Sequence, residues 1–189
     1  VYICFTKTIN YMKLLKSSML LLALSIMVVL VVLLFAKKEY SFQKDVRIKS
    51  SSSDVYNCLK FLKNQEKYNE WLNQDETTEK QYIGEDGTEQ AQFKWKSNNT
   101  YLRSGTQTLT NLVYPERIES EFIVDSPYNI VSNQHFLIKE EKNATLLTWK
   151  LNIRFPFPYN IVILSDDFES VLISSMDKSL LNVRKALEK

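Results

Sequence analysis

Histidine is the residue type most often used for acid–base or metal chemistry, and this chain has a single one, His135. A hydrolase triad or a metal centre built on it would need further partners held at defined positions. The surrounding segment alternates, so that Phe136 and Ile138 face one way while His135 and Leu137 face the other. We therefore expect His135 on the solvent side of a sheet, and we predict neither a metal site nor a catalytic residue.

The other reactive residue types also favour structural roles. The carboxylate pairs Asp166-Asp167 and Glu140-Glu141 are expected at a helix start and in a turn, as capping and solvated charge rather than acid–base groups. Cys4 and Cys58 do not make a disulfide framework, and Cys58 is expected to be a small core residue. With glycine at only 3 positions, a phosphate-cradling loop is excluded, and no cofactor is predicted.

A binding site of another kind is indicated by residues that strand alternation places on one face of a sheet. Most of them are aromatic, and plain core packing is the alternative interpretation of those. Three are polar, namely Gln107, Ser120 and Gln134, and an apolar cavity needs a few such groups to orient a ligand. The predicted pocket residues are Trp71, Phe93, Trp95, Gln107, Ser120, Phe122, Gln134, Phe136, Trp149, Phe168, Leu172 and Met176.

These residues need a helix to cover them, and the last stretch of the chain predicts one. Residues 158–189 read as a long amphipathic helix with acidic residues in its first turn and basic residues in its last, as the helix dipole prefers. A single apolar stripe requires a partner surface, and a curved sheet is the only one large enough. The stripe consists of Phe168, Leu172, Met176, Leu180, Val183 and Leu187.

Residues 40–154 mostly alternate with period two, which is typical of strands. A first strand is followed by two short helices, one after an N-cap near Asp54 and one at residues 65–71. Glu85-Asp86-Gly87 is a hairpin signal. The order predicts an α+β protein with an antiparallel sheet covered on one face by the terminal helix. The seven predicted strands are 40–49, 79–84, 89–96, 102–113, 117–124, 131–139 and 145–154.

The N-terminal region predicts a membrane anchor. Residues 19–36 are apolar except for Ser25, and as a helix they would be about 27 Å long, close to the thickness of a bilayer core. A cleaved signal peptide is the alternative, but the run is long and its end is a poor cleavage site. We expect a tail at 1–18, a transmembrane anchor at 19–36 and one domain at 37–189, with residues 1–11 an upstream extension before Met12. Flanking lysines leave the side of the membrane open.

Charge gives no reason to expect a nucleic acid as partner. Three of the 24 basic residues and none of the 22 acidic ones fall in residues 1–36, which leaves 21 bases and 22 acids in the remainder. A domain with this near-neutral balance lacks the basic surface that nucleic-acid binding requires.

The order of elements and several local motifs resemble the START-like or Bet v 1-like superfamily, in particular membrane-anchored bacterial SRPBCC proteins of the polyketide cyclase/dehydrase type. The resemblance covers residues 37–189. It departs from the relatives at Gln65, Asn69 and Glu70, where they often carry aromatic residues or Ser-Pro. The motifs are Lys37-Lys38-Glu39-Tyr40, Val55-Tyr56, Leu62-Lys63-Asn64 through Trp71, Phe93-Lys94-Trp95, Gly105 through Pro115-Glu116-Arg117-Ile118-Glu119, Phe136-Leu137-Ile138 and Thr148-Trp149.

The resemblance implies a helix-grip fold, in which a seven-stranded sheet wraps around the terminal helix and encloses an elongated apolar cavity. It implies a hydrophobic small molecule or a lipid as partner, and because no catalytic motif is found, we expect a membrane-anchored domain that binds it without catalysis. Two alternatives remain open: a polyketide cyclase/aromatase-like enzyme, whose pocket would hold a group with a strongly shifted pKa, and a protein-interaction module, with a filled core and an exposed apolar patch.

Overall fold

A computed structural model describes residues 2–99, 102–125, 128–160 and 166–188. The chain divides into two units, Val1–Lys37 and Lys38–Lys189. The first unit holds the helix α1, Tyr2–Phe35, and its segment Tyr11–Phe35 is long and apolar enough to cross a membrane. Most of its described side chains are exposed.

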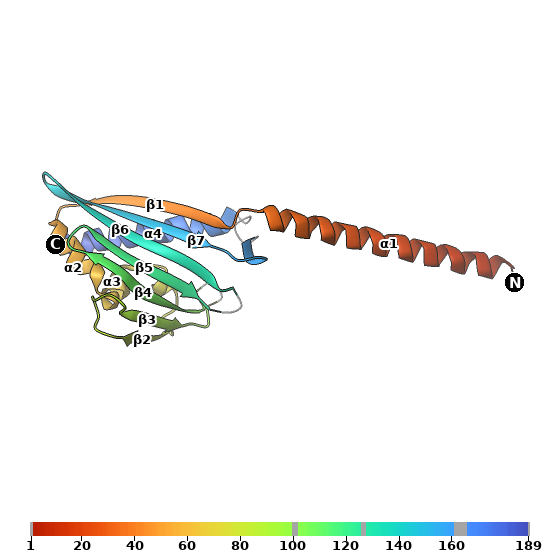
Figure 1. The fold of residues 1–189 in the computed structure, drawn as a ribbon, viewed down its shortest axis with the longest axis horizontal. Coiled ribbons are helices and arrows are strands. Elements are labelled where there is room, and N and C mark those ends of the chain that lie inside the picture. Colours follow the sequence, from red (N-terminus) through yellow and green to blue (C-terminus); the bar gives the residue numbers. More distant parts are fainter. Residues whose placement is uncertain (1, 100–101, 126–127, 161–165, 189) are drawn as a thin grey trace. The chain divides into compact units, whose positions relative to one another are not determined.

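The second unit is a sheet with three α-helices, and its elements follow the predicted order (Figure 1). The seven strands are antiparallel, and their spatial order is β1-β7-β6-β5-β4-β3-β2. The elements are β1 (Glu39–Ile48), α2 (Ser52–Lys60), the 3₁₀ turn η1 (Leu62–Asn64), α3 (Gln65–Tyr68), the 3₁₀ turn η2 (Leu72–Gln74), β2 (Glu79–Ile83), β3 (Gln92–Lys96), β4 (Ser104–Val113), β5 (Arg117–Val124), β6 (Ile130–Glu141), β7 (Ala144–Arg154) and α4 (Asp166–Leu187).

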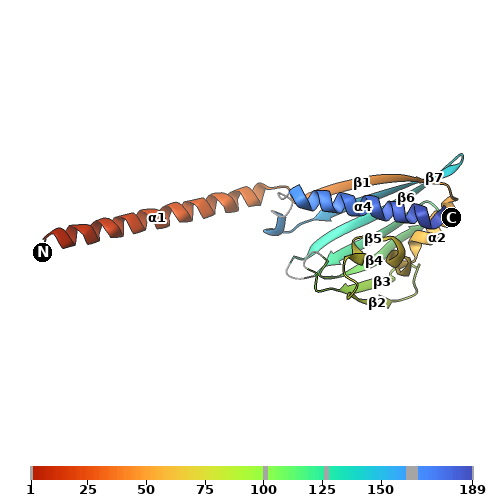
Figure 2. The same ribbon diagram turned by 180° about the vertical axis from the view of Figure 1, so that it is seen from behind.

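Helix α4 lies on one face of the sheet and packs along β1 and against α2 and α3 (Figure 2). Two contacts fix its direction: Lys44 Nζ is 2.9 Å from Asp177 Oδ2, and the Lys49 backbone N–H donates to Glu188 Oε1 at 2.7 Å. Helix α4 and β1 therefore run the same way, and the beginning of α4 lies at the beginning of β1. We call the face that α4 covers the inner face.

The terminal helix begins later than its sequence pattern predicted. Residues 158–160 form a turn in which the Tyr159 N–H donates to the Pro156 carbonyl, and α4 begins only at Asp166. Pro158 did not reveal the later start, because a proline is tolerated in the first turn of a helix, where its missing N–H would have no partner. Residues 161–165 and 189 of the predicted helix lie outside the described residues.

The predicted hairpin between β2 and β3 is also wrong in its length. Strand β3 begins at Gln92 rather than at residue 89, and residues 84–91 form a longer connection. Asp86 holds this connection against η1, since its carboxylate accepts from the backbone N–H groups of Leu62 at 2.7 Å and Lys63 at 3.2 Å. Gly87, with φ of 84°, lies against the ring of Phe61, where a Cβ would collide with it.

Smaller corrections concern the short helices. Helix α2 has Ser51 as its N-cap, whose Oγ accepts from the Asp54 N–H at 3.1 Å. The second short helix ends at Tyr68 rather than at Trp71.

Glu140 and Glu141 end β6 instead of lying in a turn, and Glu140 Oε2 accepts from Ser52 Oγ at 2.7 Å.

Candidate functional site

On the inner face, burial is complete beneath α2, where Ile48, Val55 and Leu147 are 0% exposed. At the opposite end Phe155 is 1% exposed, but Phe122 on β5 and Phe168 on α4 are only half-buried and pack against the hydrophobic core cluster. These two aromatic side chains are therefore accessible parts of an otherwise buried face.

Besides Tyr40, whose ring is 6.2 Å from that of Phe155 and linked through it to Phe168 on α4 at 5.6 Å, the aromatic side chains of the inner face form two groups on β2 to β7. The rings of Tyr82, Phe93, Trp95 and Phe122 contact one another in series across β2 to β5, with centroid separations of 5.1 to 6.1 Å. A separate pair on β6 and β7, Phe136 and Trp149, has centroids 5.3 Å apart. Neither ring group carries charge, so the surface they offer suits an apolar partner.

Four buried polar side chains connect the first group of strands to α3, and we call them the bonded cluster. Gln107 Nε2 donates to Ser120 Oγ at 3.1 Å, and Gln107 Oε1 accepts from Gln65 Nε2 at 2.7 Å. Gln65 Oε1 accepts in turn from Asn69 Nδ2 at 3.2 Å, and Asn69 Oδ1 caps two backbone N–H groups of the next turn. Every link is satisfied, so the cluster is stable without an added partner.

Two polar side chains on β6 and β7 behave differently, and we call them the unbonded pair. Trp149 is 6% exposed, and its Nε1–H is buried with no hydrogen-bond acceptor among the described residues. Gln134 is 4% exposed, and its side chain has no hydrogen bond to a described residue, but its amide atoms are not fully enclosed as Trp149 Nε1 is. A fully buried, unsatisfied group such as Trp149 Nε1 costs about 1–3 kcal/mol. By contrast, Trp95 Nε1 donates to the Leu102 carbonyl at 3.0 Å.

Eight of the twelve predicted pocket residues lie on the inner face of the sheet, whereas Phe168, Leu172 and Met176 lie on α4 and Trp71 follows α3. The fully buried ones are Phe93, Trp95, Gln107, Ser120, Gln134, Phe136, Trp149, Leu172 and Met176, and Trp71, Phe122 and Phe168 are half-buried. Sequence reasoning noticed Gln65 and Asn69 only as departures from the relatives. Residues 65–71 are mostly polar, so the polarity of Gln65 and Asn69 gave no signal that could have placed them in the bonded cluster.

Titratable groups lie mostly away from this face. His135 is on the outer side of β6, where its Nδ1 is 3.4 Å from Glu119 Oε1, as strand alternation predicted. Burial raises the pKa of Tyr68 far above its ordinary value, so this phenol stays neutral. Within the described residues, no group of three or more His, Cys, Asp or Glu side chains is placed to hold a metal ion.

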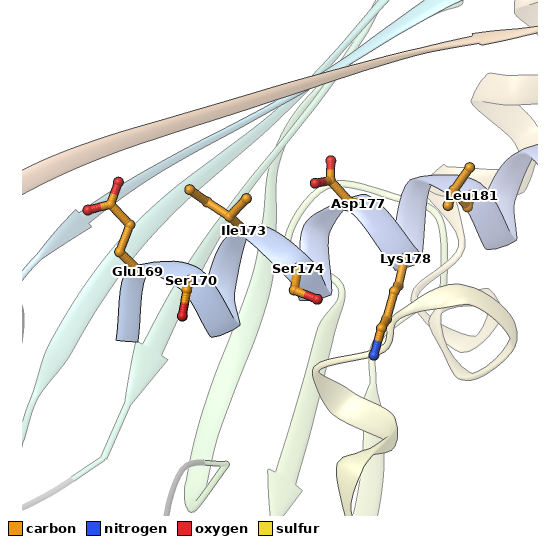
Figure 3. Close-up of a pocket in the computed structure, with 7 residues that line it drawn as sticks. All are labelled: Glu169, Ser170, Ile173, Ser174, Asp177, Lys178 and Leu181. Atoms are coloured by element: carbon orange, nitrogen blue, oxygen red, sulfur yellow. The ribbon is translucent and has the colours of Figure 1, made fainter. Parts of the chain in front are cut away.

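Two surface depressions lie elsewhere on this unit, and none of the predicted pocket residues lines either of them. One, of about 440 Å³, involves β5, β6 and the turn before β5. The other, of about 620 Å³, follows the outer side of α4 (Figure 3). It is lined by Glu169, Ser170, Ile173, Ser174, Asp177, Lys178 and Leu181.

Solved structures match this chain, whereas no family model and no curated protein does. The Aha1 dimer from Colwellia psychrerythraea is 16% identical, with 79% of this chain and 96% of that chain covered and a TM-score of 0.54. Norcoclaurine synthase from Thalictrum flavum, in complex with dopamine and hydroxybenzaldehyde, is 9% identical, with 84% and 91% covered and a TM-score of 0.59. The di-domain ARO/CYC protein StfQ is 12% identical, with 80% and 51% covered and a TM-score of 0.58. Such identities concern the fold alone, and they confirm what the sequence motifs predicted: this chain has the Bet v 1-like helix-grip fold.

Proposed function

We propose that this chain is a membrane-anchored protein that binds a hydrophobic small molecule or a lipid between the sheet and α4, without a catalytic step of its own. The observation that carries the proposal is the inner face, which is mostly apolar and aromatic, is fully buried beneath α2, and includes the half-buried Phe122 and Phe168 at the opposite end. A ligand that enters there meets aromatic rings first and polar groups deeper in. The solved complex of norcoclaurine synthase, a protein of this fold, holds small aromatic molecules.

Binding is favoured over catalysis by the kind of polar group on this face. A cyclase-type reaction, as the likeness to the ARO/CYC protein StfQ would suggest, needs a group that exchanges protons near neutral pH. All fully buried polar side chains among the described residues are uncharged types. The neutral phenol of Tyr68 would lose its proton only far above neutral pH.

Helix α1 supports the membrane part of the proposal. Its segment Tyr11–Phe35 has the length and composition of a membrane-crossing helix, properties shared with signal sequences. A domain tethered to a bilayer would exchange a poorly soluble ligand over a short path. We expect the full chain to remain in the membrane fraction after alkaline extraction, with residues 19–36 still present by mass. Release of a shorter chain lacking residues 19–36 would identify a cleaved signal sequence instead.

Binding itself is tested by native mass spectrometry of the full chain purified from its host in lipid nanodiscs, followed by organic extraction. We expect a co-purifying hydrophobic molecule that is lost from Phe122→Ala and Trp149→Ala. Tyr114→Ala is the matched control, because Tyr114 is an aromatic residue that is 62% exposed outside the inner face. A protein that carries no ligand and is not stabilised by any hydrophobic compound would contradict the proposal.

The outer side of α4 favours a second candidate, a protein-interaction module. The depression in Figure 3 includes Ile173 and Leu181, and the neighbouring Val171 is 47% exposed. The Aha1 structure of the same fold is a dimer. If this surface is an interface, Val171→Ser with Leu181→Ser should change the oligomeric state in light scattering and leave ligand retention intact.

A further inference from the structure

The connection between β7 and α4 is unusual because residues 155–164 carry no charge and read Phe-Pro-Phe-Pro-Tyr-Asn-Ile-Val-Ile-Leu. Connections between elements run over the surface and are usually built from polar residues. We infer that the described part Phe155–Tyr159, which we call the apolar turn, docks on the headgroup layer of the bilayer that holds the anchor. This inference goes beyond ligand binding and rests on the membrane anchor of the proposed function.

The apolar turn is held in place at both ends and is open in its middle. Phe155 is 1% exposed and belongs to the core, whereas Phe157 is 41% exposed and Pro158 is also exposed. The ring of Tyr159 meets the ring of Tyr128, from the connection between β5 and β6, edge to face at 4.7 Å. The turn therefore presents the Phe157 ring on its surface from a fixed support.

The covalent chain brings the apolar turn close to the bilayer. The Phe155 N–H donates to the Lys38 carbonyl at 2.8 Å, and the predicted anchor ends at Ala36. Two residues span at most about 7 Å when extended, and the headgroup layer outside the hydrocarbon core is about 5–8 Å thick. With residues 19–36 in the hydrocarbon core, Lys38 and the turn bonded to it lie in the headgroup layer or next to it.

The residues at this end of the sheet suit a membrane interface. Aromatic side chains gather there because the ring is apolar and a phenol hydroxyl stays hydrated. Phe157 supplies the apolar ring, and Tyr128 and Tyr159 supply hydroxyl groups. Charge is mixed at this end, since Arg154 Nε lies 3.9 Å from Glu39 Oε1, and it does not form the basic surface that anionic lipids attract. Docking would thus depend on apolar contact rather than on lipid charge.

Docking at this end would also set the route by which a ligand arrives. The half-buried Phe168 of α4 contacts Phe155 of the apolar turn, with ring centroids 5.6 Å apart. An accessible aromatic side chain of the proposed binding region therefore adjoins the docking surface. A hydrophobic molecule would pass from the bilayer to the protein without crossing water.

The test uses the full chain in nanodiscs of zwitterionic lipid and adds one tryptophan at a time. Phe157→Trp reports on the apolar turn. Tyr114→Trp is the matched control, because Tyr114 is an exposed aromatic residue at the other end of the sheet, where its hydroxyl donates to Ser53 Oγ of α2 at 2.9 Å. The spectrum of the wild type, with its three tryptophans, is subtracted from each variant.

We expect the emission added by Phe157→Trp to be blue-shifted, and to be quenched when the lipid is brominated on its acyl chains near the headgroup. The emission added by Tyr114→Trp should stay red-shifted and unquenched. With Tyr159→Trp as a second reporter, Phe157→Asp should reduce the quenching, because a carboxylate is costly to move out of water. Anionic lipid or added salt should leave the quenching unchanged.

Red-shifted, unquenched emission from Phe157→Trp in a chain that alkaline extraction leaves in the membrane would overturn the inference while the proposed function stands. Quenching of Tyr159→Trp that Phe157→Asp does not reduce would also overturn it. Blue-shifted emission that brominated lipid does not quench would assign this surface to protein, such as a second copy of this chain. Quenching that requires anionic lipid and disappears in salt would replace aromatic docking by attraction to Lys37 and Lys38. Release of a chain that lacks residues 19–36 would remove the proposed anchor and this inference together.

Discussion

The bonded cluster and the unbonded pair both include residues of the inner face, but the polar groups of the cluster have hydrogen-bond partners and those of the pair do not. On β4, β5 and α3, Gln107 is bonded on both sides, to Gln65 and to Ser120. On β6 and β7, Trp149 Nε1 is as deeply buried and has no acceptor among the described residues, and the Gln134 amide has no bonded partner there but is not fully enclosed. The difference in pairing separates polar groups that stabilise the fold from polar groups that do not.

The largest expected effect comes from breaking the bonded cluster. Gln107→Leu removes the acceptor of Gln65 and the donor to Ser120, and it leaves both groups buried. We expect the free energy of unfolding to fall by about 2–4 kcal/mol, measured by urea unfolding of the full chain in detergent. Gln134→Leu is the matched control on the unbonded pair and should change stability by less than about 1 kcal/mol. Equal losses would remove the distinction between the two regions.

A close approach in the backbone also distinguishes the bonded side. Gly105 lies beneath Trp95, and a Cβ there would be 2.4 Å from the Ile123 carbonyl oxygen and 2.5 Å from the Trp95 ring. We expect Gly105→Ala to lower the free energy of unfolding by about 2–3 kcal/mol in the same assay, because the carbonyl cannot move without breaking strand pairing. Ser132→Ala, a change of a small inner-face residue on β6, should have an effect below about 1 kcal/mol. A well-tolerated Gly105→Ala would show that this part of the sheet can relax.

Strand alternation predicted this inner face well because the side-chain period of a strand is fixed. Gln107, Ser120 and Gln134 follow directly from apolar neighbours two residues away, as do the outward position of His135 and the order of the strands. The long connection between β2 and β3 did not follow, since it depends on Asp86 reaching backbone groups of η1 that are distant in sequence.

The division between bonded and unbonded polar groups could not be predicted from alternation at all. Parity gives the face on which a side chain lies, and it gives no information about which partners reach it from another element. Gln65 and Asn69 come from a one-turn helix whose position is set by packing against α4, as through the bond from the Glu70 N–H to Ser179 Oγ at 2.9 Å. The three polar candidates therefore looked equivalent in the sequence and are not equivalent in the structure.

Trp95 and Trp149 allow the bonded and unbonded sides to be compared with one residue type. Trp95→Phe and Trp149→Phe remove similar apolar area, but only the first deprives a buried carbonyl, that of Leu102, of its donor. We expect Trp95→Phe to cost about 1–2 kcal/mol more than Trp149→Phe in urea unfolding of ligand-free protein. Comparable costs would indicate that Trp149 Nε1 has an acceptor after all, such as an enclosed water.

The smallest expected effect is a pH dependence confined to the loops at the edge of the bonded side. Hydrogen bonds from Ser97 Oγ, Thr77 Oγ1 and the Thr77 N–H lower the pKa of the Asp75 carboxyl from 3.8 to about 2. Because the folded pKa is depressed, the ionised carboxylate stabilises the fold above about pH 4, and this contribution is lost as the pH falls toward 2. Asp75→Asn should therefore be less stable than wild type at pH 5, and the difference in melting temperature should shrink on acidification.

The control for this prediction is Asp45→Asn on β1, an exposed carboxylate that meets Gln43 Nε2 at 3.5 Å. It keeps the same change of charge and removes no comparable set of hydrogen bonds, so melting curves at pH 5 and pH 2.5 should show a smaller change in the difference from wild type. If both variants lose the same stability with the same pH profile, the effect belongs to net charge and not to the Asp75 bonds that join the residue 75–78 loop to Ser97.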